Sequence, residues 1–156
     1  FTLRPLVLEA EGLTAALQSM ADKMEETYDQ NVVLDISEEV VSKLDMDKQG
    51  VIFFIIEEAV NNARKHAEAD HIWVRLKQLQ KDLALLAIED DGVGFDVEMV
   101  KASYEHSGSL GMINLRERTD LINGVLRVDS SPGEGTTIQV AIPLTEDAVD
   151  RIRHSM

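Results

Sequence analysis

Residues 57–66 read EEAVNNARKH and form the polar end of a long helical pattern. An apolar face runs through the same pattern, because hydrophobic residues recur at three- and four-residue spacing. These residues are Ile52, Ile55, Ile56, Ala59, Val60 and Ala63. Asp47 is of a type favoured at an N-cap, so we expect one helix from about residue 47 to about residue 67.

Four polar side chains share one stripe of this helix, at positions i, i+4, i+7 and i+8: Glu58, Asn62, Lys65 and His66. An amide oxygen can ligate Mg²⁺, lysine and histidine can meet phosphate oxygens, and a carboxylate can orient or deprotonate a nucleophile. Asn61 is adjacent, but the four-residue spacing from Glu58 selects Asn62. The stripe suits phosphoryl transfer; a solvated helix face with a Glu58–Asn62 contact is the plainer alternative.

The remaining pattern mixes helices with strands that are mostly joined as hairpins. Strand patterns cover residues 32–36, 71–79, 83–89, 125–129 and 136–142, and helical patterns cover most of the first 26 residues and 113–123. We expect Gly124 to end the helix 113–123. This order predicts an α+β fold, a two-layer α/β sandwich with a mixed sheet and helices on one face.

The apolar residues of the N-terminal helical pattern fall on one face, and they need a covering surface. They are Leu13, Ala16, Leu17, Met20 and Met24. At the other end of the chain, residues 145–156 are polar, and we expect them to form a loose tail.

A DDGVG segment, residues 90–94, follows the predicted strand 83–89. Asp90, at the end of a buried strand, can accept a hydrogen bond from an exocyclic amine such as adenine N6. Gly92 and Gly94 let the main chain turn and approach a ligand closely. An acidic turn explains the same residues. A calcium loop is disfavoured, because the run of oxygen ligands that ends in glutamate is missing.

Two further glycine segments are GSLG at 108–111 and GEGTT at 133–137. The first precedes the predicted helix 113–123, so its main-chain N–H groups can bind phosphate, although an ordinary flexible loop fits equally well. The second leads into the last strand, and a tight hairpin explains it as well. The chain contains no Walker A pattern, GxxxxGK[ST], and no dinucleotide fingerprint, GxGxxG.

Composition narrows the function classes. The 156 residues suffice for one domain with its own core, not for two. A net charge of −14 disfavours nucleic-acid binding, which depends on Lys and Arg neutralising phosphates. It does not exclude a small anion held by main-chain N–H groups and a divalent cation. The chain has no cysteine, which excludes disulfides and is compatible with a reducing cytosol.

We see no signal peptide and expect a cytoplasmic location. The chain starts at Phe1, so we take it for a piece of a longer protein, whose membrane anchoring stays open.

Taken in order, these motifs resemble those of the GHKL ATPases. EEAVNNARKH is similar to the N box, DDGVGFD to the first glycine box, GSLGM to the second, and PGEGTTIQVAIPL to the closing strand segment. INLRERTDLINGVLRVDSSPGEGT (113–136) and LRPLVLEAEGLTAAL (3–17) resemble the nitrate-sensor-like subfamily of sensor histidine kinases. The resemblance covers nearly the whole chain up to Leu144 and implies the Bergerat ATPase fold.

The resemblance implies a role for each matched position. Glu58 and Asn62 would be catalytic, with Glu58 as base or polariser and Asn62 as the Mg²⁺ ligand. The ATP-binding set would be Asn62, Lys65, His66, Asp90, Gly92, Gly94, Gly108, Gly111 and Thr136. In this set Asp90 would recognise adenine N6, with Thr136 at the same end. Gly108 and Gly111 would bracket a lid that closes on the phosphates.

The resemblance also implies the partners. The domain would transfer the γ-phosphoryl group of ATP to a histidine of the dimerisation domain, for relay to a response regulator receiver domain. The four histidines, His66, His71, His106 and His154, do not stand in a phosphoacceptor context, so we expect the acceptor upstream. We expect the fragment to be monomeric and its parent to be a homodimer.

We expect three regions: residues 1–26 as the end of the dimerisation and phosphoacceptor helices, 27–144 as the ATP-binding domain, and 145–156 as a polar tail. Two other functions stay open at this point. One is an anti-sigma-factor serine kinase, which shares the nucleotide pocket. The other is a pseudokinase that binds nucleotide or partners without chemistry.

Overall fold

The computed structural model describes residues 4–94 and 110–154. The helices are α1 (Leu6–Glu11), α2 (Leu13–Tyr28), α3 (Glu38–Ser42), α4 (Met46–Asn62), the π-helix η1 (Ala63–Ala67), α6 (Leu110–Leu121) and α7 (Glu146–His154). The strands are β1 (Asn31–Ile36), β2 (His71–Gln80), β3 (Leu83–Asp90), β4 (Val125–Ser130) and β5 (Thr136–Pro143). No helix among the described residues has the length and hydrophobicity of a membrane span.

The five strands of the described residues form one sheet in the order β1-β2-β3-β5-β4. β1 runs parallel to β2, and all other neighbours are antiparallel, so the sheet is mixed, as predicted. Two residues, Lys81 and Asp82, join β2 to β3. In contrast, β1 reaches β2 through α3, α4 and η1, because parallel neighbours need a long crossover connection.

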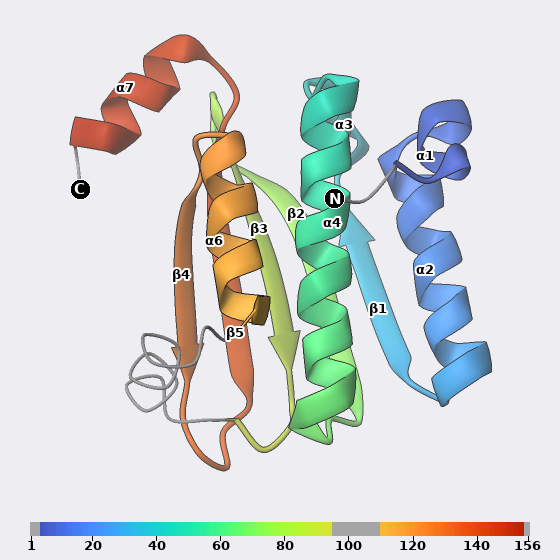
Figure 1. The fold of residues 1–156 in the computed structure, drawn as a ribbon. Helices are drawn as coiled ribbons and strands as arrows, with labels where there is room; N and C mark the ends of the chain where they lie inside the picture. The colour runs from blue at the N-terminus through green and yellow to red at the C-terminus, as the bar shows by residue number, and fades with distance from the viewer. Residues whose placement is uncertain (1–3, 95–109, 155–156) are drawn as a thin grey trace.

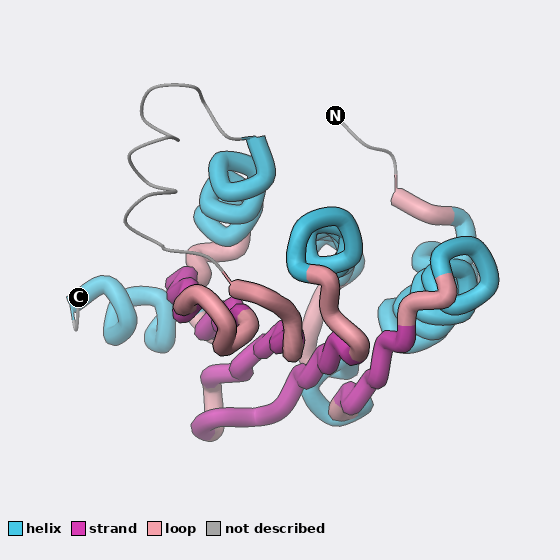
Figure 2. The backbone as a smooth tube through the Cα atoms, turned by 90° about the horizontal axis from the view of Figure 1, so that it is seen from below, coloured by secondary structure: helices cyan, strands magenta, loops and turns pink. Residues whose placement is uncertain are grey.

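Helices α2, α4 and α6 lie on one face of this sheet (Figure 1, Figure 2). The core lies between the two layers. It contains the apolar face of α4 (Ile52, Ile55 and Ile56) and alternate residues of β2 (Ile72, Val74 and Leu76), all of which are fully buried. Each such side chain contributes about 1.5–3 kcal/mol relative to an exposed position. The predicted α+β sandwich is confirmed.

Helix α4 begins earlier than predicted, because Asp45 rather than Asp47 is its N-cap. The Asp45 carboxylate accepts a 2.8 Å hydrogen bond from the main-chain N–H of Lys48. The backbone is extended at Asp45, as N-cap geometry requires, and Asp47 already lies in the first helical turn. Both aspartates are suitable by type, but the carboxylate of Asp47 bonds to Arg4 instead, at 3.2 Å.

The predicted regular helix stops being α-helical at Asn62. Residues Ala63–Ala67 form the π-helix η1, and Glu68, with φ 52°, ends it. In a π turn each N–H bonds to the carbonyl five residues earlier, so the turn is wider than an α turn. Lys65 and His66 are therefore rotated away from the straight continuation of the stripe through Glu58 and Asn62, and the four residues do not form the single α-helical stripe that we predicted.

The N-terminal helices pack into the same core as the sheet. Gly12, with φ 93°, separates α1 from α2 in a conformation that side-chain-bearing residues rarely adopt. Leu8, Leu13 and Leu17 are fully buried in the cluster that includes α4 and the strands. The domain thus covers its own N-terminal apolar stripe. That residues 1–26 are the end of a dimerisation region stays a prediction.

The C-terminal residues form a helix where we expected a loose tail. Ala148 and Ile152 of α7 pack against Leu83 and Val125. Because alternate strand residues face opposite sides, and their neighbours Ala84 and Leu126 face the main core, α7 covers the other face of the sheet. The sequence pattern did not predict this helix, because the segment is short and mostly polar. It docks through only two buried residues, Ala148 and Ile152.

Helix α6 also differs from its predicted bounds, 113–123. Its C-terminus is set by Asn123, which takes the left-handed conformation with φ 56°. Asparagine tolerates this conformation, so Gly124 is not the residue that ends the helix. Gly124 instead allows close packing, since a Cβ there would meet side-chain atoms of Thr119 and Val140 at 3.0 Å.

Candidate functional site

The elements that carry the predicted site residues meet at one end of the sheet. Figure 1 shows the C-terminal end of α4, the end of β3 and the β4–β5 hairpin at this end. Glu58 and Asn62 are partly buried on α4, while Lys65 and His66 are exposed on η1. Among the described residues, neither Glu58 nor Asn62 has a side-chain hydrogen-bond partner. Both groups are therefore available to a ligand.

Asp90 is the last residue of β3 and is partly buried. Its Oδ1 accepts a 2.9 Å hydrogen bond from the main-chain N–H of Gly92, which closes a tight turn at the strand end. Burial raises the pKa of the Asp90 carboxyl, and the N–H groups of Gly92 and Thr136 offset this only in part. A partly desolvated carboxylate with a fixed orientation is suited to accept a hydrogen bond from a ligand.

Gly92 allows the turn after β3 to pack directly on the end of η1. A Cβ at Gly92 would overlap the carbonyl carbon and oxygen of Ala67. The next residue, Val93, donates a 2.7 Å main-chain hydrogen bond to that same Ala67 oxygen. The glycine is thus required by a close approach of two main-chain segments, and it joins two of the predicted motifs.

Gly94 makes the corresponding contact with the β4–β5 hairpin. Its φ is 66°, and a Cβ would collide with the carbonyl oxygen of Ser131 and lie 2.9 Å from that of Gly135. The N–H of Gly133 bonds to the carbonyl oxygen of Val93 at 2.5 Å. The DDGVG segment is therefore held between η1 and the hairpin, which assembles three motifs in one place.

Thr136 lies directly opposite Asp90, because the two residues pair in the antiparallel register of β3 and β5. Thr136 is buried, and its Oγ1 lies 2.8 Å from Oγ of Ser130. Ser130 also donates a 3.1 Å hydrogen bond to the carbonyl oxygen of Gly135. Sequence reasoning missed Ser130. Its signal was its position in the strand that pairs with the start of β5.

The second glycine segment is described only in part. Gly108 lies outside the described residues. Gly111 is in the first turn of α6, which begins at Leu110 rather than at residue 113. The first turn of a helix leaves main-chain N–H groups without intrahelical partners, which is the feature that phosphate binding uses. The role of both glycines in a lid stays a prediction.

His71 belongs to the framework of the site, although the sequence analysis gave it no role there. Its Nδ1 lies 2.8 Å from Oδ2 of Asp91, and its main-chain N–H donates a 2.9 Å hydrogen bond to Oδ1 of the same side chain. These hydrogen bonds lower the pKa of Asp91. The pair ties the start of β2 to the turn after β3, directly beside Asp90.

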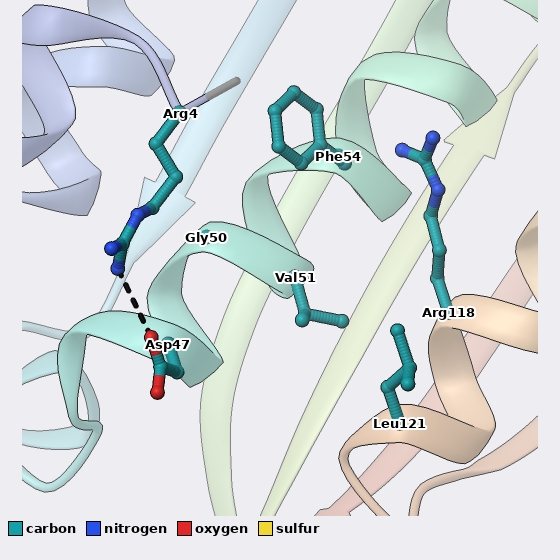
Figure 3. Close-up of a pocket in the computed structure, with 7 residues that line it drawn as sticks. All are labelled: Arg4, Asp47, Gly50, Val51, Phe54, Arg118 and Leu121. Atoms are coloured by element: carbon teal, nitrogen blue, oxygen red, sulfur yellow. Dashed lines mark hydrogen bonds and ion pairs between the residues drawn. The ribbon is translucent and has the colours of Figure 1, made fainter. Parts of the chain in front are cut away.

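A cavity of about 240 Å³ lies elsewhere, between the segment before α1, helix α4 and helix α6 (Figure 3). It is lined by Arg4, Asp47, Gly50, Val51, Phe54, Arg118 and Leu121, so none of the predicted site residues contributes to it. Arg4 bonds to Asp47 at 3.2 Å, as the dashed line in Figure 3 marks. At 1.5 Å per residue, the α4 residues that line the cavity, Asp47 to Phe54, lie about 12–22 Å along the helix from Asn62, so the cavity lies toward the N-terminal part of α4.

The described residues contain no group of three or more His, Cys, Asp or Glu side chains that could hold a metal ion. A magnesium ion does not need such a group, because it usually keeps several waters and binds through one or two protein oxygens plus substrate phosphates. The amide oxygen of Asn62, which has no hydrogen-bond partner in residues 4–94 and 110–154, fits that mode of binding.

Comparison with known proteins agrees with this geometry. The family model described as "Histidine kinase-, DNA gyrase B-, and HSP90-like ATPase" matches residues 47–146. An uncharacterized sensor-like histidine kinase of Chloroflexus aurantiacus is 41% identical over 145 residues, which are 92% of this chain and 24% of that protein. The histidine-protein kinase/phosphatase DegS of Bacillus subtilis is 34% identical over 145 residues, 91% of this chain and 37% of that protein.

The fold has a solved counterpart in the histidine kinase domain of a blue-light activated histidine kinase from Erythrobacter litoralis. The TM-score is 0.70 at 22% identity, over 87% of this chain and 63% of that one. The chain spans less than two fifths of the length of the two curated relatives. By the extent of the family match, the chain belongs to the histidine kinase-, DNA gyrase B- and HSP90-like (GHKL) ATPases, and it corresponds to the part of sensor histidine kinases that carries this domain.

Proposed function

We propose that this domain binds ATP at the end of the sheet where Asp90, Thr136 and the end of α4 meet, with Asp90 as the adenine-recognising group. The proposal rests on the burial and fixed orientation of the Asp90 carboxylate. Its carboxylate is partly buried, held by the N–H of Gly92, and placed opposite the buried Thr136. Such a group pays a desolvation cost that a hydrogen bond from adenine N6 would offset.

The phosphates would extend from this point toward α4 and η1. Lys65 and His66 are exposed there and can approach phosphate oxygens. The amide oxygen of Asn62 would hold Mg²⁺, which neutralises charge developing on the phosphoryl group when it is bound. Gly108 and Gly111 would bracket a lid whose main chain closes on the phosphates. This arrangement offsets, locally, the net charge of −14 that would otherwise repel ATP.

Within the whole protein, we propose that the γ-phosphoryl group passes to a histidine of the dimerisation domain and then to a response regulator receiver domain. Glu58, one turn before Asn62, would polarise the attacking imidazole so that its free nitrogen lone pair faces the phosphorus. Residues 1–26 would be the end of the phosphoacceptor region, 27–144 the ATP-binding domain and 145–156 the C-terminal segment. We propose a monomeric fragment, a homodimeric parent and a cytoplasmic location for this domain.

Two alternatives are less favoured. The relatives named above are histidine kinases, which does not support an anti-sigma-factor serine kinase. A pseudokinase would be expected to have lost part of the site, yet Glu58, Asn62 and Asp90 are all present. Phosphoamino-acid chemistry on the whole protein separates the two kinase functions, because phosphohistidine is acid-labile and phosphoserine is not.

The test is calorimetric titration of the chain with ATP, with and without Mg²⁺. We expect saturable binding that Asp90→Asn abolishes, because the amide cannot replace the charged acceptor. Asn62→Ala should remove the Mg²⁺ dependence. Asn61→Ala is the matched control: it removes the same side chain one position away, and it should preserve both affinity and Mg²⁺ dependence.

Two results would contradict the proposal. Full ATP affinity in Asp90→Asn would show that adenine is recognised elsewhere. Loss of the Mg²⁺ dependence in Asn61→Ala but not in Asn62→Ala would show that the ion is held by the other asparagine.

A further inference from the structure

The π-helix η1 is the segment that carries Lys65 and His66, and it is fixed from two directions. On one side, the turn after β3 bonds to it through Val93 N–H and Ala67 O at 2.7 Å. On the other side lies the C-terminal end of α2, with the side chain of Tyr28. Figure 1 shows the C-terminal ends of α2 and α4 at the same end of the molecule.

The contact on the α2 side is a stacking interaction. The guanidinium carbon of Arg64, a residue of η1, lies 3.7 Å from the centre of the Tyr28 ring. The Arg64 Nε is buried and has no hydrogen-bond partner among the described residues. The stacked guanidinium therefore gives up hydration on one side for the face of the ring, which is the geometry of a cation–π interaction.

A second contact supports the same junction. Gln30, just beyond the end of α2, is buried, and its Nε2 donates a 3.3 Å hydrogen bond to the carbonyl oxygen of Ala69. The main chain leaving η1 is thus bonded to the end of α2, while Tyr28 holds the turn itself through Arg64. A π turn is less favourable than an α turn and persists where its surroundings hold it.

We propose that Tyr28 is a positioning residue for nucleotide binding: by stacking on Arg64 it fixes the π turn that presents Lys65 and His66 to the phosphates of ATP. The inference rests on the proposed function. It assigns to a residue of α2, outside every sequence motif, an effect on phosphate affinity with no contact to the nucleotide. Removal of the ring should lower the affinity for ATP, whose phosphates would reach η1. It should leave the affinity for adenosine unchanged, because adenosine has no phosphates.

The experiment compares Tyr28→Ala with Tyr28→Phe, which keeps the ring face. Affinities for Mg-ATP and for adenosine are measured by two-dimensional NMR titration, which follows weak binding. We expect Tyr28→Ala to lower the affinity for ATP about tenfold and that for adenosine less than twofold. Tyr28→Phe should keep the wild-type ratio of the two affinities. Arg64→Lys, which keeps the charge but loses the planar stacking group, should behave like Tyr28→Ala.

A nucleotide-free measurement separates this inference from the proposed function. In the absence of ATP, Tyr28→Ala should change the amide shifts of residues 63–67 and the His66 ring shift, whereas Tyr28→Phe should not. If wild-type chain does not bind ATP, the proposed function fails while these shifts still test the junction.

The inference is overturned by any of three results. One is an ATP-to-adenosine affinity ratio in Tyr28→Ala equal to that of the wild type, and another is equal weakening of both ligands. The third is loss of ATP binding in Arg64→Lys without loss in Tyr28→Ala, which would make Arg64 a direct phosphate contact instead. Because Tyr28 is 48% exposed, its substitution should leave the chain folded, and the Arg64 variant gives an independent reading if it does not.

Discussion

The main-chain N–H of Val93 donates a 2.7 Å hydrogen bond to the carbonyl oxygen of Ala67. This bond joins the turn after β3 to the end of η1, two segments that carry different motifs of the sequence. It is possible only because Gly92, between Asp90 and Val93, has no side chain where the Ala67 carbonyl passes. The relative placement of Asp90 and the end of η1 therefore depends on this close approach.

Gly92→Ala should destabilise the fold and separate these segments, because the new Cβ would overlap main-chain atoms that cannot rotate away. Gly133→Ala is the matched control. Gly133 has φ 82° and nothing within 4 Å of an added Cβ. Alanine there should therefore cost only the strain of a left-handed backbone, about 1–2 kcal/mol. We expect a larger loss of unfolding free energy for Gly92→Ala in urea denaturation. Equal losses would show that the close approach is not a constraint.

Asp90→Asn should not lower stability at neutral pH, although we expect it to abolish ATP binding. Burial raises the folded-state pKa of Asp90 above its unfolded value. A carboxyl shifted in this direction contributes stability that is fully present below the unfolded pKa, about 3.9, and lost as pH rises through the folded value. The melting temperature of Asp90→Asn should equal or exceed that of the wild type at pH 7, and the two should converge toward pH 3. A clear decrease at pH 7 would contradict this.

Glu57→Gln should likewise raise stability at neutral pH, and it should leave ATP binding unchanged. Burial raises the pKa of Glu57, and the charge of Glu58 adds to the effect, while Arg118 and Lys23 oppose it. The ionised carboxylate thus costs stability as pH rises through its folded pKa, and the neutral amide removes that cost. Thermal unfolding at several pH values tests this. ATP affinity, measured by calorimetry, should be unchanged in this variant, because Glu57 is not among the proposed ATP-binding residues.

Docking of α7 should depend on its apolar contact more than on its ion pair. Ile152 is 8% exposed, so Ile152→Ala should cost about 2–5 kcal/mol of unfolding free energy. Arg151 bonds to Asp82 at 3.1 Å, and this contact lowers the pKa of Asp82, but the pair is exposed to solvent. Arg151→Ala should therefore have a much smaller effect, which decreases further at high salt. A larger effect for Arg151→Ala in urea denaturation would reverse this order.

Much of the fold could be predicted from local sequence patterns. The alternation in HIWVRLKQL and the apolar face of residues 52–63 determine which surfaces are buried. Each pattern gives its strand or helix one apolar face, and packing the two faces against each other removes both from water. The order of the glycine segments and EEAVNNARKH also determined the family, since each motif is modest and the ordered set is specific. The placement of Asp90 at a strand end followed from the same reasoning.

Only the tertiary structure decided how these segments meet. The π turn at Ala63–Ala67 and the docking of α7 involve contacts between residues far apart in the chain. Local sequence patterns do not reveal these contacts, because the partner residues belong to other segments: Tyr28 and Gly92 contact η1, and Leu83 contacts α7. The sequence by itself determined which side chains we propose for ATP binding, and the packing of main chain against main chain decided where they lie.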